Sequence, residues 1–195
     1  MKHLNKTICL LGLLLTSSVA SAASWQLDNG QSQLSFVSVK KNNIAEVHHF
    51  DWIAGSVNEA GELAVEIDLT SVNTGIQIRD SRMKEFFFEV SAYPTADLHA
   101  SIDPAFISEL AVGQSKPLVV DAELDLHGQQ QAVNLALMVT KISERELLVV
   151  SNQPVILNVA DFDLVKGLEK LRELAGLPSI SQAVPVSFYL TLNAM

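Results

Sequence analysis

Apolar and polar residues alternate along most of this 195-residue chain. In the segment GELAVEIDL, Leu63, Val65 and Ile67 fall on one side of an extended chain, while Glu66 and Asp68 fall on the other. Successive side chains of a β-strand point to opposite faces, so this pattern predicts strands with one buried and one solvated face. Such half-buried strands are typical of antiparallel sheets.

The same alternation recurs at intervals along the chain, with short polar turns between the segments. Strands are expected at 24–28, 33–40, 45–57, 61–69, 96–103, 118–126, 131–142, 146–158 and 186–193. Eight or nine such strands predict an all-β fold, either a two-sheet sandwich or a closed barrel. The alternation by itself does not distinguish these two architectures.

Two segments interrupt the strands, at 71–89 and at about 163–175. In the second, Leu164, Leu168 and Leu171 recur at helical spacing, and a glycine and a proline follow. This predicts a short amphipathic helix. Its polar side mixes basic and acidic residues, unlike the strongly basic face of most membrane-surface helices. We therefore expect its apolar side to cover a sheet or a barrel end.

The first residues have the composition of a secretory signal peptide. Lys2 and Lys6 precede the apolar run ICLLGLLLTSSVA, and small residues follow at 20–23. Residues 1–23 are thus expected to be cleaved, leaving one domain at 24–195. The run is too short to span a bilayer comfortably, so no integral membrane segment is expected after processing. The only cysteine, Cys9, would be removed, and no disulfide could form.

Charge and hydropathy exclude two classes of protein. Without Lys2 and Lys6 the chain has 11 basic and 22 acidic residues, a formal charge of −11. Such a surface as a whole repels phosphate backbones and anionic lipid headgroups, so nucleic acid is not an expected partner. The hydrophobic content of 48% is far from that of a disordered chain.

The residues show no recognisable catalytic motif. His48 and His49 are adjacent, and adjacent strand residues point to opposite faces, so they are not expected to share a metal ion. No Gly-x-Ser-x-Gly elbow or phosphate-binding loop is present in the sequence. No metal or cofactor is therefore expected. Two alternatives stay open: a metal-dependent enzyme using His48, His49, His99 or His127 at a barrel mouth, and an interaction protein whose barrel is filled.

The segment IRDSRMKEFFFEV, residues 78–90, sets charged side chains beside three phenylalanines. We interpret the phenylalanines, residues 86–88, as an apolar wall. The charged residues are interpreted as a polar edge that holds this segment against neighbouring strands and could meet a ligand headgroup; they are Arg79, Asp80, Arg82, Lys84 and Glu85.

Two motifs resemble those of a known family. The segment IDLTSVNTGIQIRDSRMKEFFFEVSAYPTADLHASI, followed by AELDLHGQQQAVNLAL, is similar to the two signatures of the YceI-like family of lipid- or polyisoprenoid-binding proteins. The resemblance extends from Trp25 to Leu192. It departs from the family pattern at Arg82, where many members have histidine, and in the helix at about 163–175.

This resemblance implies an extended, lipocalin-like antiparallel β-barrel of about eight strands with one or two short helices. It also implies a periplasmic binding protein or carrier that holds a long isoprenoid-type lipid, such as a polyprenyl chain or a quinone tail, in an apolar interior. A homodimer is left open. The residues expected to line the ligand site, from the apolar strand faces and the phenylalanine cluster, are Leu34, Phe36, Leu63, Val65, Ile67, Phe86, Phe87, Phe88, Leu124, Leu126, Leu135, Leu137, Phe188 and Leu190.

Overall fold

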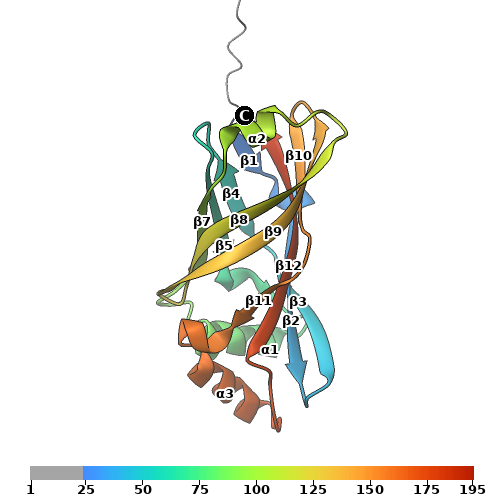
Figure 1. The fold of residues 1–195 in the computed structure, drawn as a ribbon. Coiled ribbons are helices and arrows are strands. Elements are labelled where there is room, and N and C mark those ends of the chain that lie inside the picture. The colour runs from blue at the N-terminus through green and yellow to red at the C-terminus, as the bar shows by residue number, and fades with distance from the viewer. Residues whose placement is uncertain (1–23) are drawn as a thin grey trace, which may run out of the picture.

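The structure of the protein, a computed structural model, describes residues 24–195. The predicted signal peptide lies outside these residues. An antiparallel sheet of twelve strands closes on itself and forms an elongated barrel (Figure 1). The strands are β1 (Trp25–Leu27), β2 (Gln33–Lys40), β3 (Ile44–Phe50), β4 (Ile53–Val57), β5 (Glu62–Asp68), β6 (Val72–Asn73), β7 (Thr95–Ser101), β8 (Ser115–Leu126), β9 (Gln129–Ser143), β10 (Glu146–Ser151), β11 (Val155–Asn158) and β12 (Ala183–Ala194).

Eight of these strands form the closed ring. Their order is β1-β4-β5-β7-β8-β9-β10-β12, and β1 pairs with β12 to close it. Full closure leaves no exposed edge in the ring, which removes the sites where another chain could add a strand. The predicted eight-stranded antiparallel barrel is thereby confirmed, and the sandwich is excluded.

The long strand β12 connects the ring to the remaining strands. Its second half pairs with β1 and β10, whereas its first half pairs with β11 and β2. Strand β2 continues into β3 and then β6, so the sheet extends past the ring at one end. This extension lengthens the interior beyond the eight-stranded ring.

Side chains fill one end of the barrel. Trp25, Val57, Leu147 and Leu192 form a buried cluster there. The short helix α2 (Pro104–Ser108) lies over this end, close to the described ends of the chain (Figure 1). Asp103 begins this helix by accepting a hydrogen bond from the Ala105 amide, which caps its first turn.

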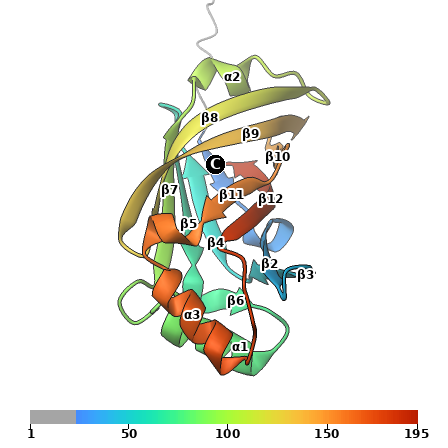
Figure 2. The same cartoon turned by 60° about the horizontal axis from the view of Figure 1, so that its bottom comes forward.

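Helical segments cover the opposite end. Figure 2 shows α1 (Gln77–Arg82) and α3 (Val165–Leu174) side by side below the barrel. Helix α1 continues directly into the π-helical turn η3 (Met83–Phe87), which packs against α3. The remaining turns are the 3-10 segments η1 (Asn29–Gln31), η2 (Leu69–Ser71) and η4 (Val159–Phe162).

The strand pattern was predicted well, and its differences from the structure occur at turns. The expected strand 45–57 is divided at Asp51 and Trp52 into β3 and β4, and 146–158 is divided into β10 and β11 near Pro154. At both places one strand ends and another begins, and a long alternating run gives no sign of such a break. Helix α2 is an additional element, because five residues are too few to establish a helical period.

Candidate binding cavity

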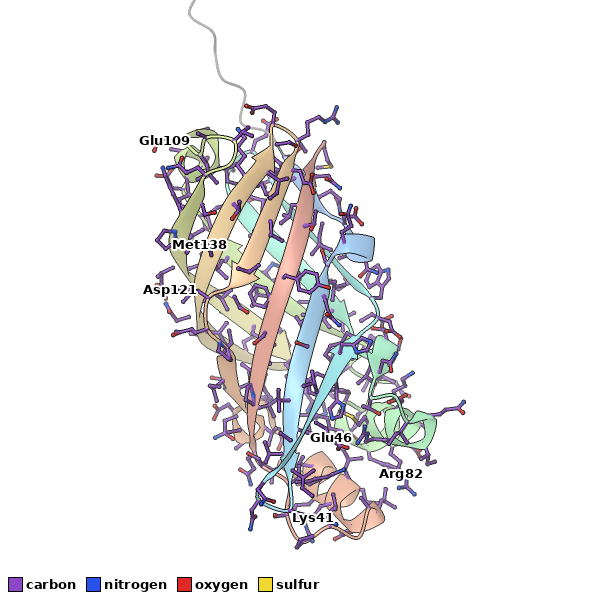
Figure 3. The ribbon with its side chains drawn as sticks, turned by 90° about the vertical axis from the view of Figure 1, so that its right-hand side faces the viewer. Lys41, Glu46, Arg82, Glu109, Asp121 and Met138 are labelled. Atoms are coloured by element: carbon purple, nitrogen blue, oxygen red, sulfur yellow. The ribbon has the colours of Figure 1, made fainter. Side chains whose placement is uncertain are left out.

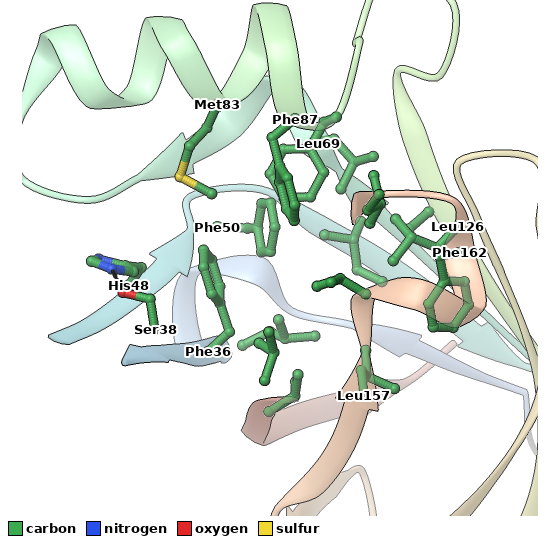
Figure 4. Close-up of a pocket in the computed structure, with 18 of the residues that line it drawn as sticks. Phe36, Ser38, His48, Phe50, Leu69, Met83, Phe87, Leu126, Leu157 and Phe162 are labelled. Atoms are coloured by element: carbon green, nitrogen blue, oxygen red, sulfur yellow. Dashed lines mark hydrogen bonds between the residues drawn. The ribbon is translucent and has the colours of Figure 1, made fainter. Parts of the chain in front are cut away.

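A cavity of about 400 Å³ occupies the helix-covered half of the barrel (Figure 4). Of its 36 lining residues, 29 are apolar. The volume falls within the range of about 300–1,000 Å³ that is usual for small-molecule sites. A wall of this composition offers no preformed hydrogen bonds along its length, so the cavity suits a largely apolar occupant.

Strands and helical segments both contribute to this wall. The barrel strands supply Val65, Ile67, Leu98, Leu124 and Leu126 among others. The helical cover supplies Met83, Phe87, Phe162, Leu164, Leu168 and Leu171. The predicted function of α3, to cover a barrel end with its apolar side, is confirmed by the burial of Leu168 and by its place in the wall.

The seven polar lining residues lie at one end of the cavity. They come from the β2–β3 hairpin, from α1 and from the segment after α3, and they are Ser38, Lys40, Glu46, His48, Arg79, Arg82 and Ser181. The side chains of Lys40, Glu46 and Arg79 are 26–31% exposed. The cavity therefore reaches solvent at this end, which we call the mouth.

Arg79 connects the elements that surround the mouth. Its Nη1 lies 2.8 Å from Glu46 Oε2 on β3, and its Nη2 donates to the Thr74 carbonyl at 2.7 Å. The same Glu46 oxygen lies 2.6 Å from Lys40 Nζ on β2. The hydrogen bond from Lys40 lowers the pKa of the Glu46 carboxyl, burial opposes this effect, and the Arg79 charge adds to it. Glu46 is therefore an anion between two cations at neutral pH.

His48 lies deeper in the mouth, next to Phe36 and Ser38 (Figure 4). Its side chain is almost fully buried, and its Nε2 lies 2.9 Å from Ser38 Oγ. Burial lowers the pKa of His48 below its ordinary value, and the Arg79 charge lowers it further. The imidazole is consequently neutral at pH 7.

Two buried polar atoms at the mouth have no hydrogen-bond partner within residues 24–195. They are His48 Nδ1 and Arg79 Nε. Leaving a buried polar atom unpaired costs on the order of 1–3 kcal/mol. Because both residues line the cavity, a polar group of an occupant could satisfy them.

The candidate lining residues fall into three groups. Eleven of the fourteen line the cavity: Leu34, Phe36, Val65, Ile67, Phe87, Phe88, Leu124, Leu126, Leu135, Phe188 and Leu190. Leu63 and Leu137 instead line a second cavity of about 60 Å³ nearer the α2 end. Phe86 lies outside both, with Lys170 Nζ 5.9 Å from its ring centre.

The two cavities share part of their walls. Val65, Leu135 and Leu190 contribute to both, so these three side chains separate the large cavity from the small one. Alternation predicts which residues point inward. It gives no position along the barrel axis, which is why Leu63 and Leu137 were grouped with the others.

The polar edge predicted for residues 79–85 is only partly realised. Arg79, Asp80 and Arg82 bond to Glu46, to the Thr74 amide and to the Leu174 carbonyl, respectively. Lys84 and Glu85 make no side-chain hydrogen bond or ion pair within residues 24–195. Glu46 was not among the predicted site residues, because no sequence pattern indicates its contact with Arg79 across 33 residues. Lys40 was not predicted either, although it pairs with Glu46 within one hairpin.

The side chains of the four histidines between residues 24 and 195 lie apart from one another. His49 is on the outer face beside Asp51 at 3.0 Å, His127 pairs with Glu89 at 2.9 Å, and His99 is exposed on β7. The prediction that His48 and His49 point to opposite faces is confirmed. Among residues 24–195, no three His, Cys, Asp or Glu side chains lie together as a metal site would require. In the same residues no helix is long and apolar enough to cross a bilayer.

The fold and the cavity define a class of proteins, closed antiparallel barrels with a deep apolar interior. The model of the YceI-like domain matches residues 25–192, so the chain belongs to the YceI-like family. The resemblance seen in the sequence is thus confirmed.

Solved structures show the same architecture. The chain is 40% identical to a polyisoprenoid-binding domain from Saccharophagus degradans implicated in plant cell wall breakdown, with a TM-score of 0.87; the match covers 89% of this chain and 99% of that one. It is 16% identical to Burkholderia cenocepacia BcnA, with a TM-score of 0.63 and coverage of 85% and 98%. A Campylobacter jejuni YceI protein is 15% identical, with a TM-score of 0.54 and coverage of 75% and 83%. A search of curated proteins found no match.

Proposed function

We propose that this protein is a periplasmic binding protein or carrier that holds a long isoprenoid-type lipid in its barrel. The observation that carries this proposal is the cavity of about 400 Å³ whose polar residues all gather at the mouth. Each methylene group transferred from water to an apolar site contributes roughly 0.8 kcal/mol, so a long chain can bind tightly without catalytic groups. The 40% identical relative is named for polyisoprenoid binding, which supports the same class of ligand.

The polar mouth gives the bound lipid a direction. The apolar chain would extend past Phe36 and Phe88 toward Val65, with its headgroup near His48 and Arg79. Those two residues hold the unpaired buried atoms, and Arg79 Nε can only donate. A headgroup with a hydrogen-bond acceptor, such as a quinone carbonyl or a phosphate oxygen, would satisfy it.

Export rests on the signal-like residues 1–23 alone, so the periplasmic location is part of the proposal. No cofactor is assigned, and binding rather than catalysis is proposed as the activity. Binding is favoured over a metal-dependent activity because His49 and His127 lie apart, each beside a different carboxylate.

Mass spectrometry of organic extracts from the purified protein tests the proposal. A bound isoprenoid lipid at close to one equivalent is expected. A protein that carries no lipid and binds neither an added polyprenyl phosphate nor an added long-tailed quinone would refute it. Fractionation of the producing cells tests the location separately, with the protein expected in the periplasm and lacking residues 1–23.

A further inference from the structure

The basic residues of this acidic protein are concentrated at the mouth. Three segments surround it: the tip of the β2–β3 hairpin at 40–47, α1 with η3 at 77–87, and α3 with the chain that follows at 165–181. We call these segments the rim. They contain eight of the eleven lysine and arginine residues found between 24 and 195.

The acidic residues are distributed in the opposite way. The rim contains five of the 22 aspartate and glutamate residues, and the other described residues contain 17 with only three basic side chains. The rim therefore has a formal charge of +3, and the rest of residues 24–195 has −14. Figure 3 shows Lys41 and Arg82 at this end and the acidic residues Glu109 and Asp121 farther along the barrel.

Several rim charges are free to meet a partner. Lys41 and Lys166 are exposed, and neither forms an ion pair within the described residues. Others are already engaged: Lys40 and Arg79 with Glu46, and Arg172 with Glu169 at 2.7 Å. The charge surplus is thus carried by side chains on the outside of the rim.

Apolar side chains are exposed on the same rim. Val47 is 70% exposed, Ile78 59%, Ile44 42% and Leu174 37%. The inner side of α3 cannot serve as a docking face, because Leu168 and Leu171 are occupied as part of the cavity wall. Exposed apolar groups among basic ones are the combination that binds the interface of an anionic bilayer.

We propose that the rim docks the protein, mouth first, onto an anionic phospholipid bilayer. Basic side chains near such a surface each strengthen binding on the order of five-fold. The acidic remainder of the barrel does not prevent this, because charges more than about 8 Å from the surface are largely screened at physiological salt. The mouth would then face the acyl-chain region directly. The proposal does not depend on which lipid the cavity holds.

Vesicle flotation with the purified protein tests whether the basic residues of the rim contribute to bilayer binding. The vesicles contain phosphatidylcholine with 30% phosphatidylglycerol, or phosphatidylcholine alone, and no isoprenoid compound. The double variant Lys41→Glu/Lys166→Glu is compared with Lys116→Glu/Arg145→Glu, which changes the net charge equally at the other end. All variants keep the same N-terminal residues, so any contribution from these cancels.

Binding to the anionic vesicles is expected to weaken roughly 30-fold or more in the rim variant and to persist in the control. It should also decrease strongly in 0.5 M NaCl. Equal losses in both variants would show that net charge, and not the rim, governs binding. That result, absence of binding, or equal binding to neutral vesicles would overturn the proposal.

A second comparison of two double variants tests whether the exposed apolar residues of the rim contribute to bilayer binding. Val47→Ser/Ile78→Ser removes exposed apolar groups from the rim, and Val119→Ser/Ile156→Ser removes groups that are 66% and 61% exposed elsewhere. The rim pair is expected to weaken vesicle binding at least several-fold while the control pair leaves it unchanged. Equal binding by both pairs would contradict an apolar contact between the rim and the bilayer. Lipid extraction from the same variants reports on the cavity separately.

Discussion

Gly167 of α3 lies directly against the backbone of Phe86, so that a Cβ atom added at Gly167 would overlap the Phe86 carbonyl oxygen and come within 2.8 Å of Phe87 Cα. Helix α3 and the π-helical turn η3 therefore touch backbone to backbone. Only glycine permits this approach, and it brings Leu168 and Phe87 into one cavity wall.

Gly167→Ala should separate α3 from η3. Glycine to alanine usually stabilises a helix, but here the methyl group would force the two backbones apart at a cost of about 1–3 kcal/mol. Urea denaturation gives the free energy of unfolding. Gly30→Ala is the control, since its added Cβ would meet Asp28 Oδ1 at an ordinary 3.4 Å. An unchanged free energy of unfolding in Gly167→Ala would contradict the close contact.

His48 should make the stability depend on pH. Its pKa is lowered in the folded protein, first by burial and then by Arg79, so the unfolded chain binds a proton that the folded one does not. The stabilisation from neutral His48 is fully present above the unfolded pKa near 6.5 and is lost as the pH falls through the lower folded value. Thermal unfolding between pH 7.5 and 5.5 measures it.

His48→Gln should flatten this dependence, whereas the exposed His99→Gln should leave it unchanged. Glu46 titrates below this window, because its pKa is lowered from an already acidic value. A pH profile unaffected by His48→Gln would show that another group is responsible.

Replacing each of two buried alanines by phenylalanine should show which part of the interior is a cavity and which part is packed core. Ala96 lines the large cavity, while Ala122 is buried among Val120, Leu135 and Leu137 and lines neither cavity. Ala122→Phe should cost about 1–3 kcal/mol of stability by overpacking. Ala96→Phe should cost less and should reduce the amount of lipid that extraction recovers. Equal destabilisation by both would indicate that the barrel is filled.

Arg79→Lys should loosen the mouth even though the charge is retained. A lysine ammonium is a single point and cannot bond Glu46 and the Thr74 carbonyl together as the guanidinium does. The loss of the bond to buried Thr74 should cost about 1 kcal/mol in urea denaturation. Arg145→Lys, where the arginine makes only an exposed 3.4 Å bond to Ala194, should have no measurable effect.

Much of the barrel could be predicted from local patterns, because the alternation within each strand shows which of its side chains face the interior and which face solvent. The alternation in 61–69 assigned Val65 and Ile67 to the interior, where they line the cavity. It could not show that Leu63, one step along the same face, belongs to the smaller cavity. Height along a barrel depends on strand register, which the pairing of distant strands sets.

The mouth was less predictable for the same reason. Arg79 was recognised as part of a polar edge, but its partner Glu46 was not, since they meet only when the β2–β3 hairpin extends beyond the ring. The three consecutive phenylalanines could not all face one way on a helical turn. Phe87 and Phe88 enter the cavity wall, and Phe86 points toward Lys170.

The pairing that closes the barrel joins residues at opposite ends of the described chain, Trp25 with Ala194 and Leu27 with Leu192. The ring cannot form during synthesis until β12 is complete, and contacts so distant in sequence form slowly. A growing chain would thus remain unclosed until β12 has been synthesised. For a protein that we propose is exported, this dependence on β12 means that a partly synthesised chain cannot form the closed ring on the cytoplasmic side of the membrane.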